Sequence, residues 1–349
     1  MNATKATNPR QLWERYRSNL PRHLLGISRY LQADTMHRLT SQRGHQGLRM
    51  SFEPYITLVG TTGCRLTELA DILGISKQAC NQTANQIELA GYIERVSDPL
   101  DGRAKKLQLT RRGQQLMRDG ADIAGQNEAH FRKLLGKRDI DQLASLLAQL
   151  FSGLGLQRPK VSKRDIDTSA LLSGLLPRLG DYVMHRLMEL TIAKGHPGLK
   201  MSHGQVLTLI GISGGYIQQM AAIQEVSKQA ISAIVNELEL LGYLYREVDP
   251  NDARQQRILL TPAGIQLLGA SVASVDQLEK EFTVLLGKKN LQQIKSIAEQ
   301  LYQSLQLEED VFGPRQDLLT LAQQLKKQLG RQELRELTRL LQIDNEVLA

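Results

Sequence analysis

The sequence predicts a mainly α-helical protein with small β-hairpins, built as two copies of one domain. A stretch at residues 76–89, SKQACNQTANQIEL, returns 151 residues later at 227–240 as SKQAISAIVNELEL. The surrounding residues 47–113 and 198–264 agree at roughly 40 % of positions without a gap, and so long a period indicates a duplicated domain, not a solenoid. Just after each stretch, helical periodicity changes to an alternation of apolar and polar residues, as in a strand.

The first copy begins with helices. Apolar residues recur at steps of three and four over residues 11–43, where Pro21 is expected to interrupt the helix. Short helices are expected at 51–60 and 67–73, and Gly74 makes the turn before the helix at 76–89. Two short helices and a glycine turn before a capped helix form the helix-turn-helix order.

A β-hairpin and two longer helices complete the copy. Strand-like segments at 92–96 and 106–109 flank a run of turn-forming residues, so a hairpin follows the capped helix and makes the unit a winged helix. Two helices then occupy 110–151, with a break at Gly136. The second copy repeats this order, and Thr261 caps its corresponding helix.

The repeat and the composition of its flanks set the expected domain boundaries. A Gly-, Pro- and charge-rich segment separates the copies, and two Leu-rich helical segments follow the second one, resembling a partial third copy of the closing helix pair. The predicted units are a winged-helix domain at 1–155, a linker at 156–167, a second winged-helix domain at 168–310 and a helical tail at 311–349.

The capped helices are expected to have one buried and one exposed face. Ser76 and Ser227 are good N-caps. The apolar stripe is Ile231, Ile234, Val235 and Leu238 in the second copy, and Cys80, Thr83, Ala84 and Ile87 in the first. Amides and lysines occupy the opposite face, where Asn and Gln can pair bidentately with adenine in a major groove. A solvated helix face without a ligand is the alternative.

Composition restricts the class of protein. The chain has 349 residues, 41 % of them apolar, and a formal net charge of +8, which favours a polyanionic partner. Aromatic residues, at 4 %, are too few for a surface that stacks single-stranded bases. The sequence has neither an apolar signal core nor a membrane-span pattern, so we expect a cytoplasmic protein that does not contact a membrane.

Reactive side chains are interpreted as structural. His45 and His196 occupy equivalent positions without metal-ligand spacing around them, so loop histidines are favoured over ligands. Cys80 takes the position of a buried isoleucine, and Cys64 is placed in a loop between helices. Both cysteines lack counterparts in the second copy, which argues against a disulfide framework.

No catalytic pattern is evident in the sequence. There is no nucleophile elbow, phosphate-binding loop or paired carboxylate site, so we expect neither an enzyme nor a bound cofactor. Trp13, Tyr16 and Tyr30 are expected in the core of a helical bundle, with a small-molecule pocket as the alternative.

The two copies resemble the MarR family of bacterial transcription regulators over nearly all of residues 10–308. In that family's wing, Asp-x-Arg precedes Leu-x-Leu-Thr-x-x-Gly. The matching residues are Asp101, Arg103, Leu107, Leu109, Thr110 and Gly113 in the first copy, and Asp252, Arg254, Ile258, Leu260, Thr261 and Gly264 in the second.

The resemblance implies two winged helices held on a dimerisation bundle and placed on a palindromic DNA site. Because both units lie in one chain, we expect an intrachain pseudo-dimer in which the long helices at 11–43, 110–151, 165–194 and 261–307 form one bundle. The implied function is a sequence-specific regulator of transcription, a repressor released by a small-molecule effector. A replication-initiator-like or architectural DNA-binding protein is the alternative, and a protein-interaction module is a third hypothesis.

We expect the DNA contacts to come from the capped helices and the wings. The predicted residues are Ser76, Lys77, Gln78, Asn81, Gln82, Asn85, Arg103, Lys105, Lys106, Ser227, Lys228, Gln229, Ser232, Asn236, Arg254 and Arg257. The first wing is more basic, with Arg111 and Arg112 after it, and Asn81-Gln82 corresponds to Ser232-Ala233. We therefore expect an asymmetric operator that the first copy binds more strongly.

Overall fold

The computed structural model describes most of both copies. The described residues are 8–60, 62–98, 101–156, 171–224, 226–249 and 252–308, with Gly330, Glu333, Leu334 and Glu336. Apart from Leu156, the predicted linker lies outside this part of the chain. The predicted tail, which resembles a third copy of the closing helix pair, also lies outside it, apart from Gly330, Glu333, Leu334 and Glu336.

The first copy has the predicted order of elements. Its elements are α1 (Pro9–Arg17), α2 (Leu20–Ser41), η1 (Met50–Phe52), α3 (Glu53–Val59), β1 (Cys64–Arg65), α4 (Leu66–Leu73), α5 (Lys77–Leu89), β2 (Ile93–Asp98), β3 (Asp101–Leu109), α6 (Arg111–Leu135) and α7 (Lys137–Gly153). The predicted interruption near Pro21 exists, but it lies at Ser18 and Asn19. Asn19 caps α2, and Pro21 belongs to its first turn, where a missing N–H costs nothing.

The second copy repeats the first almost element for element. Its elements are α8 (Leu172–Ala193), α9 (Met201–Ile210), α10 (Ile217–Ile223), α11 (Lys228–Leu240), β4 (Leu244–Asp249), β5 (Asp252–Leu260), α12 (Pro262–Leu286) and α13 (Lys288–Ser304). From α5 to α7, each element recurs 151 residues later with the same bounds, which confirms the tandem winged-helix prediction.

Local sequence signals account for the positions of the main elements. The side-chain oxygens of Ser76 and Ser227 accept hydrogen bonds from the third helical amide of α5 and α11, at 3.1 Å in both. Thr110 and Thr261 do the same for α6 and α12, at 3.1 and 3.0 Å. These caps satisfy amides that lack a partner within the helix.

The first wing contains a strand that the sequence did not indicate. Cys64 was expected in a loop, but it lies in β1 and pairs with Leu107 of β3, which makes a three-stranded antiparallel sheet. In the second copy the corresponding contact is a single bridge between Gly215 and Ile258. Burial raises the pKa of the Cys64 thiol to about 11, so the thiolate that a redox sensor needs is disfavoured.

The long helices of both copies share one apolar core. It is formed by buried residues of α2, α6, α7, α8, α12 and α13, including Leu24, Phe131, Leu176, Phe282 and Leu301. Helices at equivalent positions meet each other, α2 with α8 and α7 with α13. Contacts between non-equivalent helices of the two copies also come in symmetry-related pairs. Helix α2 packs on α13, and its equivalent α8 packs on α7. In the same way, α12 packs on α7 and α6 packs on α13. This pattern gives the bundle a near two-fold symmetry within one chain.

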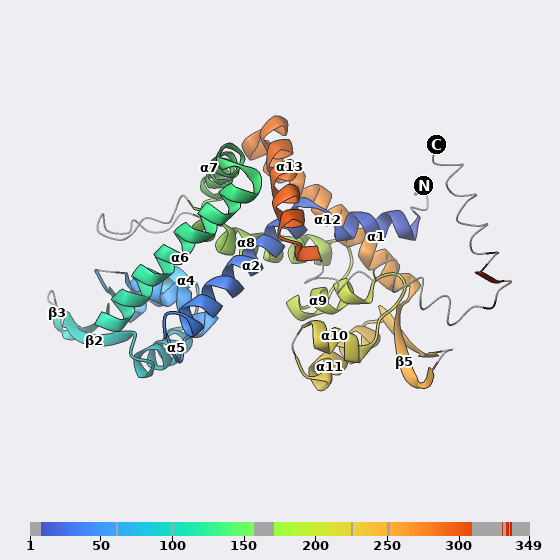
Figure 1. Ribbon diagram of the computed structural model, residues 1–349. Coiled ribbons are helices and arrows are strands. Elements are labelled where there is room, and N and C mark those ends of the chain that lie inside the picture. Colours follow the sequence, from blue (N-terminus) through green and yellow to red (C-terminus); the bar gives the residue numbers. More distant parts are fainter. Residues whose placement is uncertain are drawn as a thin grey trace.

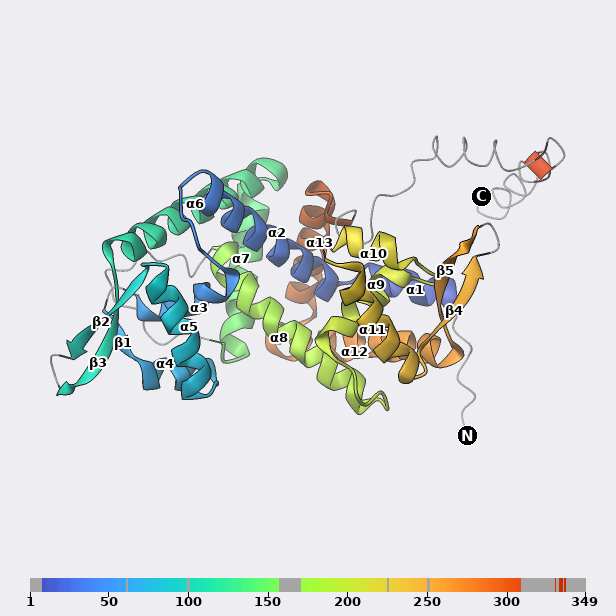
Figure 2. The same ribbon diagram turned by 90° about the horizontal axis from the view of Figure 1, so that it is seen from below.

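Both winged helices lie on one side of this bundle. Figure 1 shows α5 and α11 below the bundle, and Figure 2 shows the two wings at opposite ends of that side. The shared core is therefore the scaffold that sets the relative position of the two capped helices.

Two glycines permit close packing across the copies. An ideal Cβ on Gly26 of α2 would lie 2.4 Å from the ring of Tyr302 in α13. This ring is 4 % exposed, and its hydroxyl donates a hydrogen bond to the Leu307 carbonyl at 3.1 Å, so it has little freedom to move. A Cβ on Gly180 of α8 would approach the Ser28 hydroxyl of α2 to 3.3 Å.

Helix α1 of the first copy packs on the second copy. Trp13 and Tyr16, which were expected in the bundle core, instead join a separate cluster with Leu12, Leu268 and Val272. The Tyr16 hydroxyl lies 3.2 Å from that of Thr208. Tyr30, in contrast, packs against the bundle core as expected. Residues 160–168, which correspond to α1 in the second copy, lie outside the described residues.

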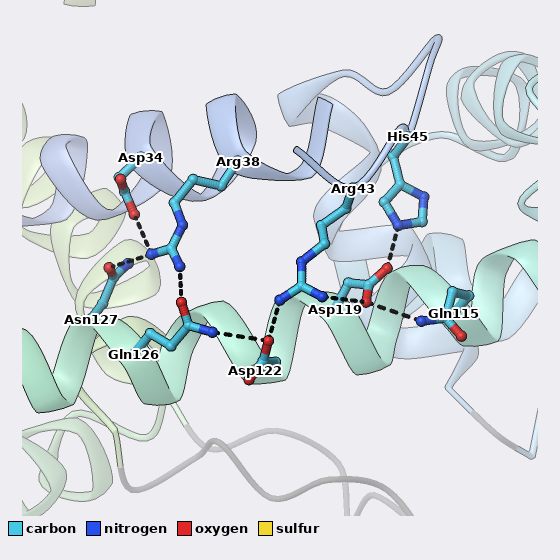
Figure 3. A network of polar contacts seen from close by, with 9 residues as sticks. All are labelled: Asp34, Arg38, Arg43, His45, Gln115, Asp119, Asp122, Gln126 and Asn127. Atoms are coloured by element: carbon cyan, nitrogen blue, oxygen red, sulfur yellow. Dashed lines mark hydrogen bonds and ion pairs between the residues drawn. The ribbon is translucent and has the colours of Figure 1, made fainter. Parts of the chain in front are cut away.

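A polar network ties the end of α2 to α6 within the first copy (Figure 3). Arg43 forms an ion pair with Asp122, and Arg38 donates a hydrogen bond to Asn127 at 3.2 Å. His45 lies in the loop after α2, as expected, and its buried ring lies 2.8 Å from Asp119. Burial alone would raise the pKa of Asp119, yet hydrogen bonds from His45 and Gln115 outweigh it and hold this pKa below its usual value. The second copy has Ala270 and Ala273 in place of the two aspartates.

We predict that Gly26→Ala lowers the free energy of unfolding by about 1–3 kcal/mol, because overpacking against the Tyr302 ring exceeds the gain in helix propensity. The control is Gly125→Ala in α6, where an added Cβ meets no heavy atom within 4 Å. This control should be neutral or stabilise by up to about 1 kcal/mol. Thermal unfolding followed by circular dichroism measures both, and equal effects would contradict the packing.

We also predict a pH dependence from His23, which is 5 % exposed. Burial, aided by the charge of Arg22, lowers its pKa to about 4. The unfolded chain, with a histidine pKa near 6.5, takes up the proton first, so stability falls as the pH drops from about 6.5 to 4, by on the order of 3 kcal/mol. His23→Gln should remove most of this dependence in urea unfolding curves, whereas His37→Gln on the exposed side of α2 should leave it. A wild-type curve that is flat between these pH values would refute the assignment.

Candidate nucleic-acid interface

Helix α5 exposes the polar face that the sequence predicts. Cys80, Ala84 and Ile87 are buried, so the helix packs through its apolar stripe. The exposed predicted residues are Ser76, Lys77, Gln78, Asn81, Gln82 and Asn85. A helix that is anchored on one side and lined with amides on the other has the form required to enter a major groove.

Helix α11 shows a similar face with fewer amides. It buries Ile231, Val235 and Leu238. Among the predicted residues, Ser227, Lys228, Gln229 and Asn236 are exposed and Ser232 is half-buried. The Lys228 ammonium donates a hydrogen bond to the Gln218 side chain of α10 at 3.2 Å.

The two described lysines of the first wing do not lie together. Lys105 and Lys106 are adjacent in β3 and therefore point to opposite faces of the hairpin. Lys105 is exposed, whereas the half-buried Lys106 lies over the Gly63 position. Arg103 belongs to β3, but its side chain lies outside the described part of the structure. In the second wing, Arg254 is exposed and Arg257 lies 4.0 Å from Glu247.

Arg112 was expected to belong to the basic surface of the first wing, but its side chain contacts other residues of the fold. Its guanidinium lies 4.6 Å from the centroid of the Tyr92 ring. It also donates a hydrogen bond to the Gln46 carbonyl at 2.8 Å. These contacts tie the start of α6 to the loop after α2, which is a structural role.

A polar contact near the turn of each hairpin ties the wing to the residue that precedes the first helix of the helix-turn-helix. Arg65 of β1 donates to the buried Asp98 carboxylate at 2.6 Å, at the start of the hairpin turn. In the second copy, the Tyr216 hydroxyl donates to Asp249, which is also buried. The aspartate of each Asp-Pro pair therefore stabilises the wing.

Arg95 of β2 is a residue of this surface that the sequence analysis did not single out. Its Nη2 donates to the side-chain oxygens of Asn81 at 3.0 Å and Asn85 at 2.6 Å, and its Nη1 pairs with Glu88. Arg246 of β4 makes the corresponding contacts with Asn236 and Glu239. The sequence repeat could have indicated these contacts, because the arginine, the asparagine and the glutamate are the same in both copies.

Comparison with family models shows which family the two winged helices resemble. A model of the MarR family matches two segments, residues 56–104 and 198–255, one in each winged helix. The chain contains two MarR-like domains in tandem, as the resemblance of both copies to this family implied.

Two curated relatives of the chain are transcriptional regulators, and they match over part of their length. One is the HTH-type transcriptional regulator BilQ of Clostridioides difficile (strain CD3), 26 % identical over 84 residues, which are 24 % of this chain and 57 % of BilQ. Another is a putative transcriptional regulatory protein for the hcr operon of Thauera aromatica, 26 % identical over 106 residues, which are 30 % of this chain and 62 % of that protein. The matches thus cover less than two thirds of both relatives.

Several solved structures align with part of the chain. The transcriptional regulator Tm0710 from Thermotoga maritima has a TM-score of 0.32 and 20 % identity, over 38 % of this chain and 91 % of that one. A mutant of S. aureus MepR bound to an oligodeoxyribonucleotide has a TM-score of 0.28 and 23 % identity, over 36 % and 95 %. CouR from Rhodococcus jostii RHA1, bound to p-coumaroyl-CoA, has a TM-score of 0.30 and 24 % identity, over 38 % and 91 %.

The two MarR-like domains differ in charge along the interface. From the cap of the exposed helix to the start of the next long helix, residues 76–112 contain seven basic and four acidic residues, a net charge of +3. The equivalent residues 227–263 contain four basic and five acidic residues, a net charge of −1. The interface segment of the first domain is therefore the more positively charged of the two.

Two other kinds of feature are absent from the described residues. Within this part of the chain, no group of three or more His, Cys, Asp or Glu side chains is placed to hold a metal ion. No helix among these residues is both long and apolar enough to cross a membrane.

Proposed function

We propose that this chain is a sequence-specific, double-stranded DNA-binding regulator of transcription. The observation that supports this best is the placement of α5 and α11, two serine-capped helices with exposed polar faces, on one side of a shared bundle. In dimers of helix-turn-helix proteins, two such helices contact successive turns of the major groove. Here one chain supplies both helices.

We propose further that the operator is a pseudo-palindrome with unlike halves. The exposed face of α5 has Asn81 and Gln82 where α11 has Ser232 and Ala233, so the bases preferred at these positions should differ. The net charges of +3 and −1 support stronger binding of the first half-site. Glu247, one of the acidic residues in this count, lies 4.0 Å from Arg257 in the second wing and partly offsets its charge.

The sign of regulation that we propose is repression. A single chain with its two recognition helices already positioned loses little freedom on binding and can occupy a promoter in competition with polymerase. We place a small-molecule effector in the open groove of about 430 Å³ beside α2, lined by Arg29, Gln32, Ala33, Met36, His37 and Met50. This groove lies between the bundle and η1 of the first winged helix, so a ligand there would change the position of α5 relative to α11.

Selection of binding sites from random duplex DNA, at several salt concentrations, tests this proposal. We expect a preferred sequence with two half-sites about one helical turn apart, and an affinity that falls steeply with salt. Binding that is equally strong to all duplexes would favour an architectural protein instead.

We predict that Lys105→Ala weakens binding and reduces the slope of log affinity against log salt by about one, because one phosphate contact is lost. The matched control is Gln256→Ala, at the equivalent position of the second wing, which should leave the slope unchanged.

For the pair of wing arginines, Arg103→Ala should weaken binding more than Arg254→Ala. Equal losses for the two arginines, in fluorescence anisotropy titrations with the selected duplex, would argue against the asymmetry.

A further inference from the structure

The contacts of Arg95 fix the orientation of two amides on the exposed face of α5. A guanidinium has hydrogen-bond donors and no acceptor, so it can bind an asparagine side chain only through the amide oxygen. Arg95 binds the Oδ1 atoms of Asn81 and Asn85 together, at 3.0 and 2.6 Å. Glu88, one turn further along α5, pairs with the same guanidinium and holds it in place.

The same arrangement recurs in the second copy with one amide fewer. Arg246 donates to Oδ1 of Asn236, and its Nε lies 3.0 Å from Glu239. Ser232 occupies the position of Asn81, so the second helix has one amide held in this way and the first has two. Both arginines come from the first strand of their hairpin, β2 or β4, which couples the wing to the exposed face of the helix.

Orientation determines what these amides offer to a base. With the oxygen turned toward the arginine, the Nδ2 amino group of each asparagine is the part left to contact a ligand, and it only donates hydrogen bonds. In the major groove, guanine presents two acceptors, O6 and N7, and thymine presents O4. Adenine presents N7 beside its amino group, and cytosine presents an amino donor. Bidentate pairing with adenine, which we expected from the sequence, requires the amide oxygen that Arg95 now holds.

We propose that Arg95 and Arg246 are positioning residues that determine base preference by presenting Asn85, Asn81 and Asn236 as donors. The inference rests on the proposed function and specifies it. At the positions that face these amides, guanine is the most preferred base and cytosine the least preferred. There are two such positions in the first half-site and one in the second. The arginines themselves do not contact the bases.

Base preference of the intact chain, measured by site selection and by titration of single-base variants of the selected duplex, tests this inference. Arg95→Met keeps most of the side-chain stem and removes the guanidinium. We expect it to reduce the discrimination between guanine and cytosine in the first half-site by roughly tenfold, with the second half-site unchanged. Arg246→Met is the matched control and should have the reverse pattern.

Salt dependence separates positioning from a direct phosphate contact. If Arg95 bound a phosphate, Arg95→Met would lower affinity for all sequences and reduce the salt slope by about one. Our inference predicts an unchanged slope and an altered base preference. An unaltered base preference would overturn it, whatever happens to the slope.

Asn85→Asp gives a second test that does not depend on removing Arg95. The aspartate keeps the pairing with Arg95 but replaces the Nδ2 donors by an acceptor oxygen. We expect the preferred base at the facing position to change from guanine to cytosine, whose amino group donates. Retention of guanine would contradict the inference. A wild-type chain that selects no duplex sequence would instead refute the proposed function itself.

Discussion

The crossing of α2 with α8 is the contact on which the rest of the structure depends. These helices are equivalent members of the two copies, and they meet in the core that also contains α6, α7, α12 and α13. Because the core is common to both copies, neither winged helix has a bundle of its own. The close approach at Gly26 and Gly180 leaves little room for the helices to shift. Covalent linkage places the partner helices at a high effective concentration, so assembly does not depend on the concentration of protein.

One chain that forms both halves of a pseudo-dimer allows the halves to differ. The first winged helix is tied to the bundle by the ion pairs and hydrogen bonds between the end of α2 and α6 (Figure 3). The second is contacted by α1, through Trp13 and Tyr16 and an ion pair between Arg15 and Asp276 at 2.6 Å. The two units therefore differ both in how they are attached and in their charge. In a dimer of separate chains, such a difference would require two different chains.

The sequence predicted correctly those features that depend on residues close together along the chain. The caps at Ser76 and Thr110 and the buried stripe of α11 follow from nearest neighbours along the chain, and the structure confirms them. The missed strand β1 has two residues, too few for a periodic signal, and its partner Leu107 lies more than forty positions away. Arg112 was assigned to the DNA surface from its charge alone, because its aromatic partner Tyr92 lies in another part of the fold. The Arg95 contacts join a strand to a helix face, and only the repeat of identical residues hinted at them.

The mass of the protein–DNA complex is the most direct test of the claim that one chain supplies both DNA-binding units. Native mass spectrometry of the chain with its selected duplex gives the number of chains bound, each of 39.1 kDa. Our account predicts one chain per two-half-site duplex at every protein concentration, with protection from nuclease over both half-sites. Two chains on one such duplex, or a footprint confined to one half-site, would contradict it.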